Sequence, residues 1–77
     1  MDKKPLPIAL REATAALEGV SDTARLDAEL LAAHVMGMER MDMLARRGGL
    51  AAPDGFDAMV ARRMADEPVA YITGAQA

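Results

Sequence analysis

The chain has 77 residues, a net charge of −3 and a hydrophobic share of 52%, and it contains no cysteine. This length allows one small domain, and the missing cysteine excludes disulfides, thiolate metal sites and cysteine nucleophiles. Nine Lys and Arg against twelve Asp and Glu leave no overall positive field that would attract nucleic acid. Residues 1–5 lack the apolar region of a signal peptide and no run reaches the roughly 18 apolar residues of a membrane span, so we expect a cytoplasmic protein.

Aromatic residues are scarce, with one Phe, one Tyr and no Trp. A core made of Leu, Val, Ile, Met and many Ala suits closely packed helices better than a β-sandwich. The sequence therefore predicts an all-α fold, a small bundle of four to five helices.

The first predicted helix covers residues 7–18. Apolar residues recur there at intervals of four, three and four: Leu6, Leu10, Ala13 and Leu17. Gly19 ends this helix, and residues 21–23, Ser-Asp-Thr, offer three candidate N-cap residues for the next one.

The strongest helix signal is the central run RLDAELLAAHVMG, residues 25–37, which ends at Gly37 as a natural C′ residue. At 100° per residue an apolar face covers most of its circumference and includes Leu26, Leu30, Leu31, Ala33, His34 and Val35. A narrow polar strip is expected at Arg25, Glu29 and Ala32. Helices should therefore surround this element.

Two further helices and a helical turn are predicted in the second half. Residues 38–47 form a short helix that places inward Met41, Leu44 and Ala45. The next helix begins with Pro53 at N1, and its inward stripe comprises Phe56, Met59, Val60, Arg63 and Met64. Pro68 stops it, and we expect residues 69–72 to form a helical turn in preference to a short strand. Core filling is the expected role of Met41, Met59 and Met64.

Asp27 interrupts the apolar face of the central helix, where an unpaired carboxylate is expensive. Arg63 lies on the inward stripe of the later helix and Arg62 flanks it. We predict that one of them, Arg63 first, meets Asp27 across the bundle as a structural buried pair.

His34 does not complete a catalytic or metal site with Asp27. The two residues lie about 10 Å apart along the helix axis, and they lack the i, i+4 spacing of a helical zinc site. We expect His34 to pack between helices. The residues themselves predict no catalytic, cofactor-binding or metal-binding group.

The adjacent pair Arg46 and Arg47 is a candidate contact for a ligand or partner, because arginine forks suit carboxylate and phosphate groups. The double glycine that follows is no phosphate loop, since it follows a helix and lacks the P-loop lysine.

Two segments together resemble the N-terminal domain of the HemK/PrmC family, protein-(glutamine-N5) methyltransferases of peptide-chain release factors. These segments are RLDAELLAAHVMG at residues 25–37 and RRMADEPVAYITG at residues 62–74. The resemblance implies that residues 1–74 are a helical substrate-recognition domain. It also implies that residues 75–77 begin a truncated connector to an absent domain that binds S-adenosylmethionine.

The resemblance further implies methylation of the glutamine in the Gly-Gly-Gln motif of the release factor, by an enzyme that uses an Asn-Pro-Pro-Tyr motif. Neither that motif nor a glycine-rich cofactor loop occurs in this chain, so no catalytic or cofactor-binding residue carries over. We expect the 77 residues alone to be inactive.

The release factor is the implied partner, and the implied contact surface comprises Arg46, Arg47 and the loop 48–54 with Asp54. We expect a monomer with an exposed apolar area around Val69, Tyr71 and Ile72. A free-standing helical module that binds another protein is the alternative, and a nucleic-acid-binding domain is disfavoured by the acidity of the chain.

Overall fold

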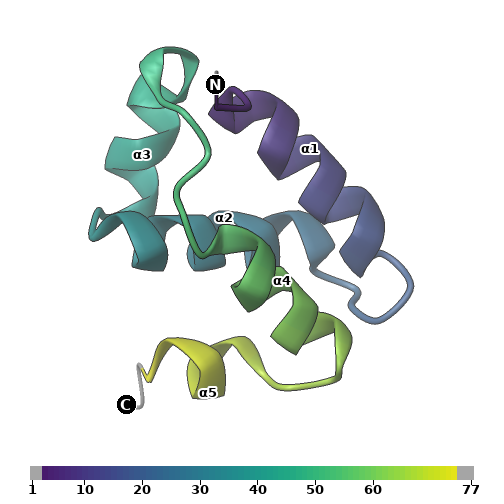
Figure 1. Ribbon diagram of the computed structural model, residues 1–77. Coiled ribbons are helices and arrows are strands. Elements are labelled where there is room, and N and C mark those ends of the chain that lie inside the picture. Colours follow the sequence, from purple (N-terminus) through teal and green to yellow (C-terminus); the bar gives the residue numbers. More distant parts are fainter. Residues whose placement is uncertain (1–2, 75–77) are drawn as a thin grey trace.

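The computed structural model describes residues 3–74, which form helices and no β-strand (Figure 1). The elements in chain order are α1 (Leu6–Leu17), α2 (Ala24–Met36), α3 (Arg40–Arg46), the 3-10 turn η1 (Arg47–Gly49), α4 (Phe56–Met64) and α5 (Val69–Thr73). The predicted all-α class and the predicted helical turn after Pro68 are confirmed.

Helix α2 is the central element of the bundle. It contacts α1, α3, α4 and α5, while α1 also contacts α4 and the turn η1. Figure 1 shows α1 and α3 on either side of the segment that leads to α4. The bundle is therefore organised around one helix, as the central sequence signal predicts.

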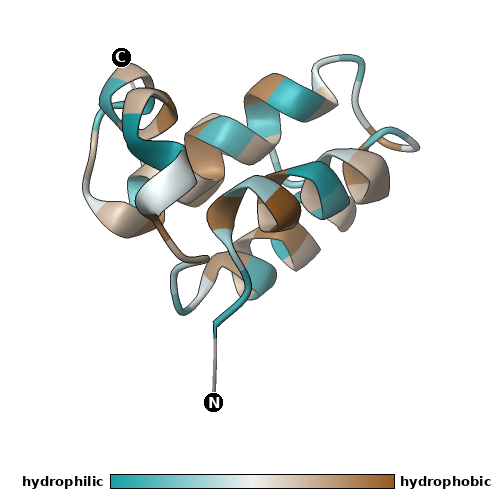
Figure 2. Cartoon of the chain, turned by 90° about the horizontal axis from the view of Figure 1, so that it is seen from above, coloured by the Kyte–Doolittle hydropathy of each residue, from teal (hydrophilic) through white to brown (hydrophobic). Residues whose placement is uncertain are grey.

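Helix α1 buries the stripe that its spacing predicts: Leu6, Leu10, Ala13 and Leu17. Hydrophobic and hydrophilic residues alternate along the helices in Figure 2, as expected for helices with one buried face. The largest fully buried side chains of the core are Phe56, Leu6, Leu17, Leu31 and Met43.

The turn after α2 is made at Gly37, whose φ of 68° is left-handed. The amide of Met38 donates to the carbonyl of Ala33 at 3.0 Å, so a carbonyl at the helix end is satisfied in the turn. Only glycine takes this backbone angle without steric cost, and the predicted helix end at Gly37 is confirmed.

The segment between η1 and α4 is tied to the start of the described chain. The amide of Leu6 donates to the carbonyl of Leu50 at 3.0 Å, and the amide of Ala52 donates to the carbonyl of Lys4 at 2.8 Å. These bonds surround an isolated antiparallel bridge between Pro5 and Ala51. They hold η1 beside α1 without a sheet.

The packing face of α2 differs from the predicted one. Ala32 and Glu29, expected on a polar strip, are buried, whereas Leu26 and His34, expected on the apolar face, are exposed. Alanine is only weakly hydrophobic, so a hydrophobic pattern does not identify it as buried. Small side chains such as Ala28 and Ala32 nevertheless lie inward, because they let neighbouring helices approach closely. Helix α2 therefore turns its alanines inward.

Helix α3 begins at Arg40 and buries Met43, which the sequence pattern missed. Met41 is 68% exposed and Ala45 is also exposed, so their predicted inward positions are wrong, while Leu44 is half-buried against the core. A helix of two turns contains too few apolar residues for periodicity to fix which side faces inward.

Helix α4 begins at Phe56, not at Pro53. Gly55 precedes it with a φ of 90°, and this left-handed angle prevents a helix from running through from Pro53. Phe56 and Val60 are buried, and Met59 packs half-buried against the core. Met64 is 48% exposed, so its predicted core role is wrong.

Helix α5 covers part of the area expected to be exposed. Ile72 is buried and Val69 packs half-buried against the core, whereas Tyr71 is 65% exposed. The expectation of an exposed apolar area therefore holds for Tyr71 and is wrong for Ile72. The five residues of α5 suffice to contact both α2 and α4 and to bury Ile72.

The side chain of Asp27 is only 9% exposed, and its carboxylate accepts three hydrogen bonds. Nε of Arg63 lies 3.1 Å from Oδ2 of Asp27, so α4 meets α2 through this pair. The hydroxyl of Ser21 donates to the same oxygen at 2.6 Å, and the hydroxyl of Thr23 donates to Oδ1 at 3.0 Å. Thr23 lies at the N-cap position, but its hydroxyl donates to the Asp27 carboxylate and accepts no hydrogen bond from a backbone amide of the helix.

The pKa of Asp27 is lower than that of an ordinary aspartate. Burial is the largest influence and acts in the opposite direction, because it disfavours the charged form. The hydrogen bonds from Ser21, Arg63 and Thr23, together with the charge of Arg63, outweigh burial. The ionised carboxylate is thus the form that the fold stabilises.

Asp27→Ala should lower the free energy of unfolding by about 2 to 4 kcal/mol, because it removes the buried partner of Arg63, whose side chain is only 14% exposed and keeps only the exposed Asp66 at 3.7 Å. Urea unfolding followed by circular dichroism measures this loss. The more exposed pair of Arg62 and Glu67 provides a control, and Glu67→Gln should leave the midpoint almost unchanged. Equal midpoints for the two variants would contradict a structural role for Asp27.

Asp27 should also make stability depend on pH in the acid range. Its pKa is lowered by folding, so its contribution is complete above the unfolded value of about 4 and is lost as pH falls toward the lower folded value. Thermal melts between about pH 6 and pH 3 should therefore decline less steeply for Asp27→Asn than for the unsubstituted chain. If the melting temperatures of the two chains fell in parallel with pH, Asp27 would not be the group that causes the loss of stability in acid.

Candidate partner-binding site

Within residues 3–74, no three His, Cys, Asp or Glu side chains gather where they could hold a metal ion. No helix in this part of the chain is long and apolar enough to cross a membrane. Charged side chains do line a hollow between the helices.

A groove of about 540 Å³ lies between α1, α2 and the end of α3. Three arginines from three different elements line it, and we call it the arginine groove: Arg11 of α1, Arg25 of α2 and Arg47 at the start of η1. Leu10 and Leu44 form an apolar part of the groove wall. The volume lies within the roughly 300 to 1,000 Å³ of typical ligand sites.

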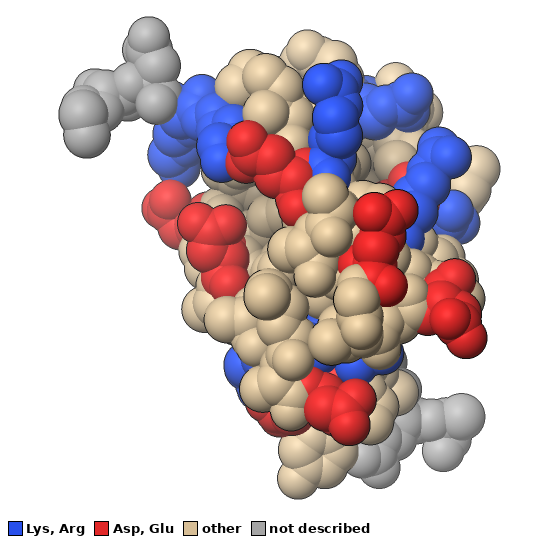
Figure 3. Space-filling view, turned by 90° about the vertical axis from the view of Figure 1, so that its right-hand side faces the viewer, with Lys and Arg blue, Asp and Glu red and all other residues tan. Residues whose placement is uncertain are grey.

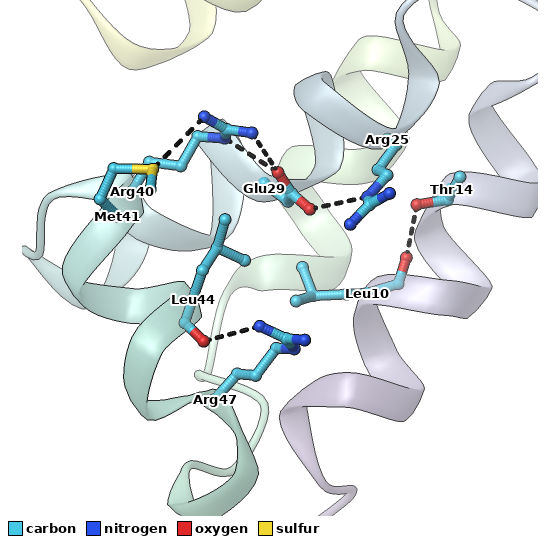
Figure 4. Close-up of polar contacts among 8 residues, drawn as sticks. All are labelled: Leu10, Thr14, Arg25, Glu29, Arg40, Met41, Leu44 and Arg47. Atoms are coloured by element: carbon cyan, nitrogen blue, oxygen red, sulfur yellow. Dashed lines mark hydrogen bonds and ion pairs between the residues drawn. The ribbon is translucent and has the colours of Figure 1, made fainter.

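Glu29 lines the inner part of the groove, and its side chain is only 5% exposed. Nε of Arg25 donates to Oε2 at 3.2 Å, and Nε of Arg40 donates to Oε1 at 2.8 Å (Figure 4). Two guanidinium groups thus share one carboxylate, which leaves an excess positive charge around it. The side chain of Arg25 is 81% exposed, so it presents its remaining donors to solvent.

Arg47 and Arg11 provide the other two cations of the arginine groove. Nη1 of Arg47 donates to the carbonyl of Leu44 at 2.7 Å, so this arginine closes the end of α3 (Figure 4). Arg11 is exposed and forms no ion pair with the residues that the structure describes. The hydroxyl of Thr14 bonds to the Leu10 carbonyl at 2.7 Å within α1 and is not directed to a ligand.

The charge of the arginine groove differs in sign from that of the whole chain. Glu18 is the acidic residue that lines the groove besides the paired Glu29. Figure 3 shows Lys and Arg gathered in the upper part of the face over α1, with Asp and Glu among and below them. Although the chain carries −3 overall, the groove is therefore a local basic region.

The structure separates the residues that the sequence analysis grouped as a partner surface. Arg47 lines the arginine groove, whereas Arg46 is exposed outside it. Asp54 lies in another hollow with Lys3, whose Nζ is 3.4 Å from Oδ1 of Asp54. A role of Arg46, Arg47 and Asp54 in partner binding stays a prediction, but Asp54 does not belong with the arginines.

Three residues of the site were missed by the sequence analysis: Arg11, Arg25 and Glu29. The i, i+4 spacing of Arg25 and Glu29 is a signal that would have indicated their pairing. Nothing in the sequence indicates that Arg11 faces them. Asp27 and Arg63 do meet, but they lie outside the arginine groove.

The chain matches a known family and a curated protein. Residues 9–74 match the family described as the PrmC N-terminal domain. The chain is also 43% identical over 67 residues to the release factor glutamine methyltransferase of Corynebacterium glutamicum. That alignment covers 86% of this chain and 24% of the relative, so the chain spans about a quarter of the length of the curated relative it matches. No solved structure matches the chain.

Glu29→Gln should lower the free energy of unfolding by about 1 to 2 kcal/mol, because it removes a buried charge that holds two guanidinium groups. Arg25→Gln should have a smaller effect, since that side chain is largely exposed. Urea unfolding at neutral pH compares the two variants. If Arg25→Gln cost as much as Glu29→Gln, the shared carboxylate would not be the stabilising element.

Proposed function

Because this chain belongs to the family of PrmC N-terminal domains, we propose that it is the substrate-recognition domain of a release factor glutamine methyltransferase. The proposed parent enzyme methylates the side-chain amide nitrogen of the glutamine in the Gly-Gly-Gln motif of a peptide-chain release factor. The observation that carries this proposal is the family match, which runs from within α1 to the end of α5. The whole bundle, not one helix, supports the assignment.

We assign S-adenosylmethionine, the proposed methyl donor, to a part of the parent enzyme outside this domain. Cofactors with an adenosine group are commonly held where a strand passes through a glycine-rich loop into a helix. Residues 3–74 form no strand, so they do not fit that kind of site. The role of this domain is then binding and orientation of the protein substrate.

Recognition by a separate domain is chemically useful for this reaction. The reacting glutamine amide is small and uncharged, so it provides little binding energy of its own. Contacts remote from the reacting atoms can hold the release factor in position while another domain performs the transfer. A packed bundle with a charged groove is suited to such contacts, because its helices hold the arginines at fixed relative positions.

Deleting residues 1–74 from the parent enzyme should lower kcat/KM for the intact release factor by about 10-fold or more, mainly through KM. Methylation of a short peptide that carries the Gly-Gly-Gln motif should change little, because the peptide is too small to reach this domain. Mass spectrometry of the methylated glutamine measures both rates.

The peptide substrate also controls for correct folding of the truncated enzyme. An unchanged kcat/KM for the intact release factor would overturn the recognition role. An equal loss with both substrates would also overturn it, because it would show that residues 1–74 support the fold of the enzyme and not the recognition of its substrate. A reading frame that stops at Ala77 would instead favour the free-standing interaction module.

A further inference from the structure

Building on the proposed function, we propose that the arginine groove receives an acidic segment of the partner protein, one in which carboxylates flank an aliphatic side chain. The segment would lie between α1 and the end of α3.

The first support is the supply of unused donors in the arginine groove. Arg11 has no ion-pair partner among residues 3–74, and the hydrogen bond of Arg47 to the Leu44 carbonyl uses a single nitrogen, Nη1. Each guanidinium carries five N–H donors in a planar fork that matches a carboxylate. Two arginines from α1 and η1 therefore face one groove with most of their donors available.

The second support is preorganisation by Glu29. Its buried carboxylate holds Arg25 through Nε, and the same group is shared with Arg40. Because Arg25 is already held, a ligand that binds it loses less side-chain entropy than it would with a free arginine. Within the groove the charges of Arg25 and Glu29 cancel, so the net attraction for an added anion comes from Arg11 and Arg47, which exceed Glu18 by one charge.

The third support is the mixed lining of the arginine groove, which favours a peptide over a nucleic acid. Half-buried Leu44, together with Pro7 and Ala15 of the same lining, offers aliphatic contacts beside the arginines. Glu18 also lines the groove and would repel a continuous row of phosphates, and the whole chain is acidic at −3. A segment of alternating carboxylates and aliphatic side chains fits both the charge and the apolar wall.

The arginines on either side of the groove boundary provide matched variants. Arg47→Gln and Arg11→Gln each remove one positive charge from the groove, and Arg46→Gln removes one charge from the exposed neighbour outside it. Fluorescence anisotropy of the 77-residue chain would use three labelled probes: the release factor, the peptide Glu-Glu-Leu-Glu-Glu-Leu, and a single-stranded oligonucleotide. The same peptide with Gln in place of Glu is the neutral control.

Arg47→Gln and Arg11→Gln should each weaken binding of the release factor and the acidic peptide by about 2- to 5-fold, while Arg46→Gln leaves both within error. The neutral peptide should bind more weakly than the acidic one. Added salt should weaken acidic-peptide binding to the unsubstituted chain. Circular dichroism melts establish that each variant is folded.

The outcomes separate this inference from the proposed function. If all variants bind the release factor equally, the arginine groove is not the contact surface, but the proposed function still stands. Binding of the acidic peptide at the groove without any binding of the release factor supports the groove chemistry and counts against the proposed partner. Groove-dependent binding of the oligonucleotide alone, or no binding of any probe, overturns the acidic-segment proposal.

Discussion

The buried charge of Asp27 is the constraint on which the bundle depends. A buried carboxylate in the first turn of the central helix is tolerated only where donors surround it, and these come from the preceding loop and from α4. Arg63 reaches it from α4, so the pair favours an arrangement in which this face of α4 lies against the start of α2. The ion pair therefore restricts the arrangement of the helices more than apolar packing alone would, because Ala, Leu and Met side chains tolerate small shifts.

A second buried carboxylate extends the same principle to the other side of α2. Asp27 is paired with α4, and Glu29 is paired with Arg40 at the start of α3. Two acidic residues on one helix thus select the neighbours on two sides. They also divide the roles of the arginines, since Arg63 is largely buried, whereas Arg25 is exposed in the arginine groove.

The fold could be predicted largely from the sequence, because helix ends such as Gly37 and a long stripe such as that of α1 depend on local chemistry. The buried side of α2 could not, since alanines and the paired Glu29 look polar or neutral in a hydrophobic pattern. The candidate site could be predicted only in part. Arg47 stood out by its sequence, but Arg11 joins it through the tertiary arrangement of α1 and α3, which no local pattern contains.

The hydroxyls of Ser21 and Thr23 give Asp27 partners that are close in sequence, whereas Arg63 is 36 residues away. Contacts between neighbouring segments form with a small loss of chain entropy, so we expect α1 and α2 to associate first, with the carboxylate already hydrogen-bonded. Helix α4 then closes on a prepared acidic site. During synthesis the first half of the domain can therefore begin to fold before Arg63 has been made. The carboxylate of Asp27 is then already hydrogen-bonded to Ser21 and Thr23 and is not buried without a partner.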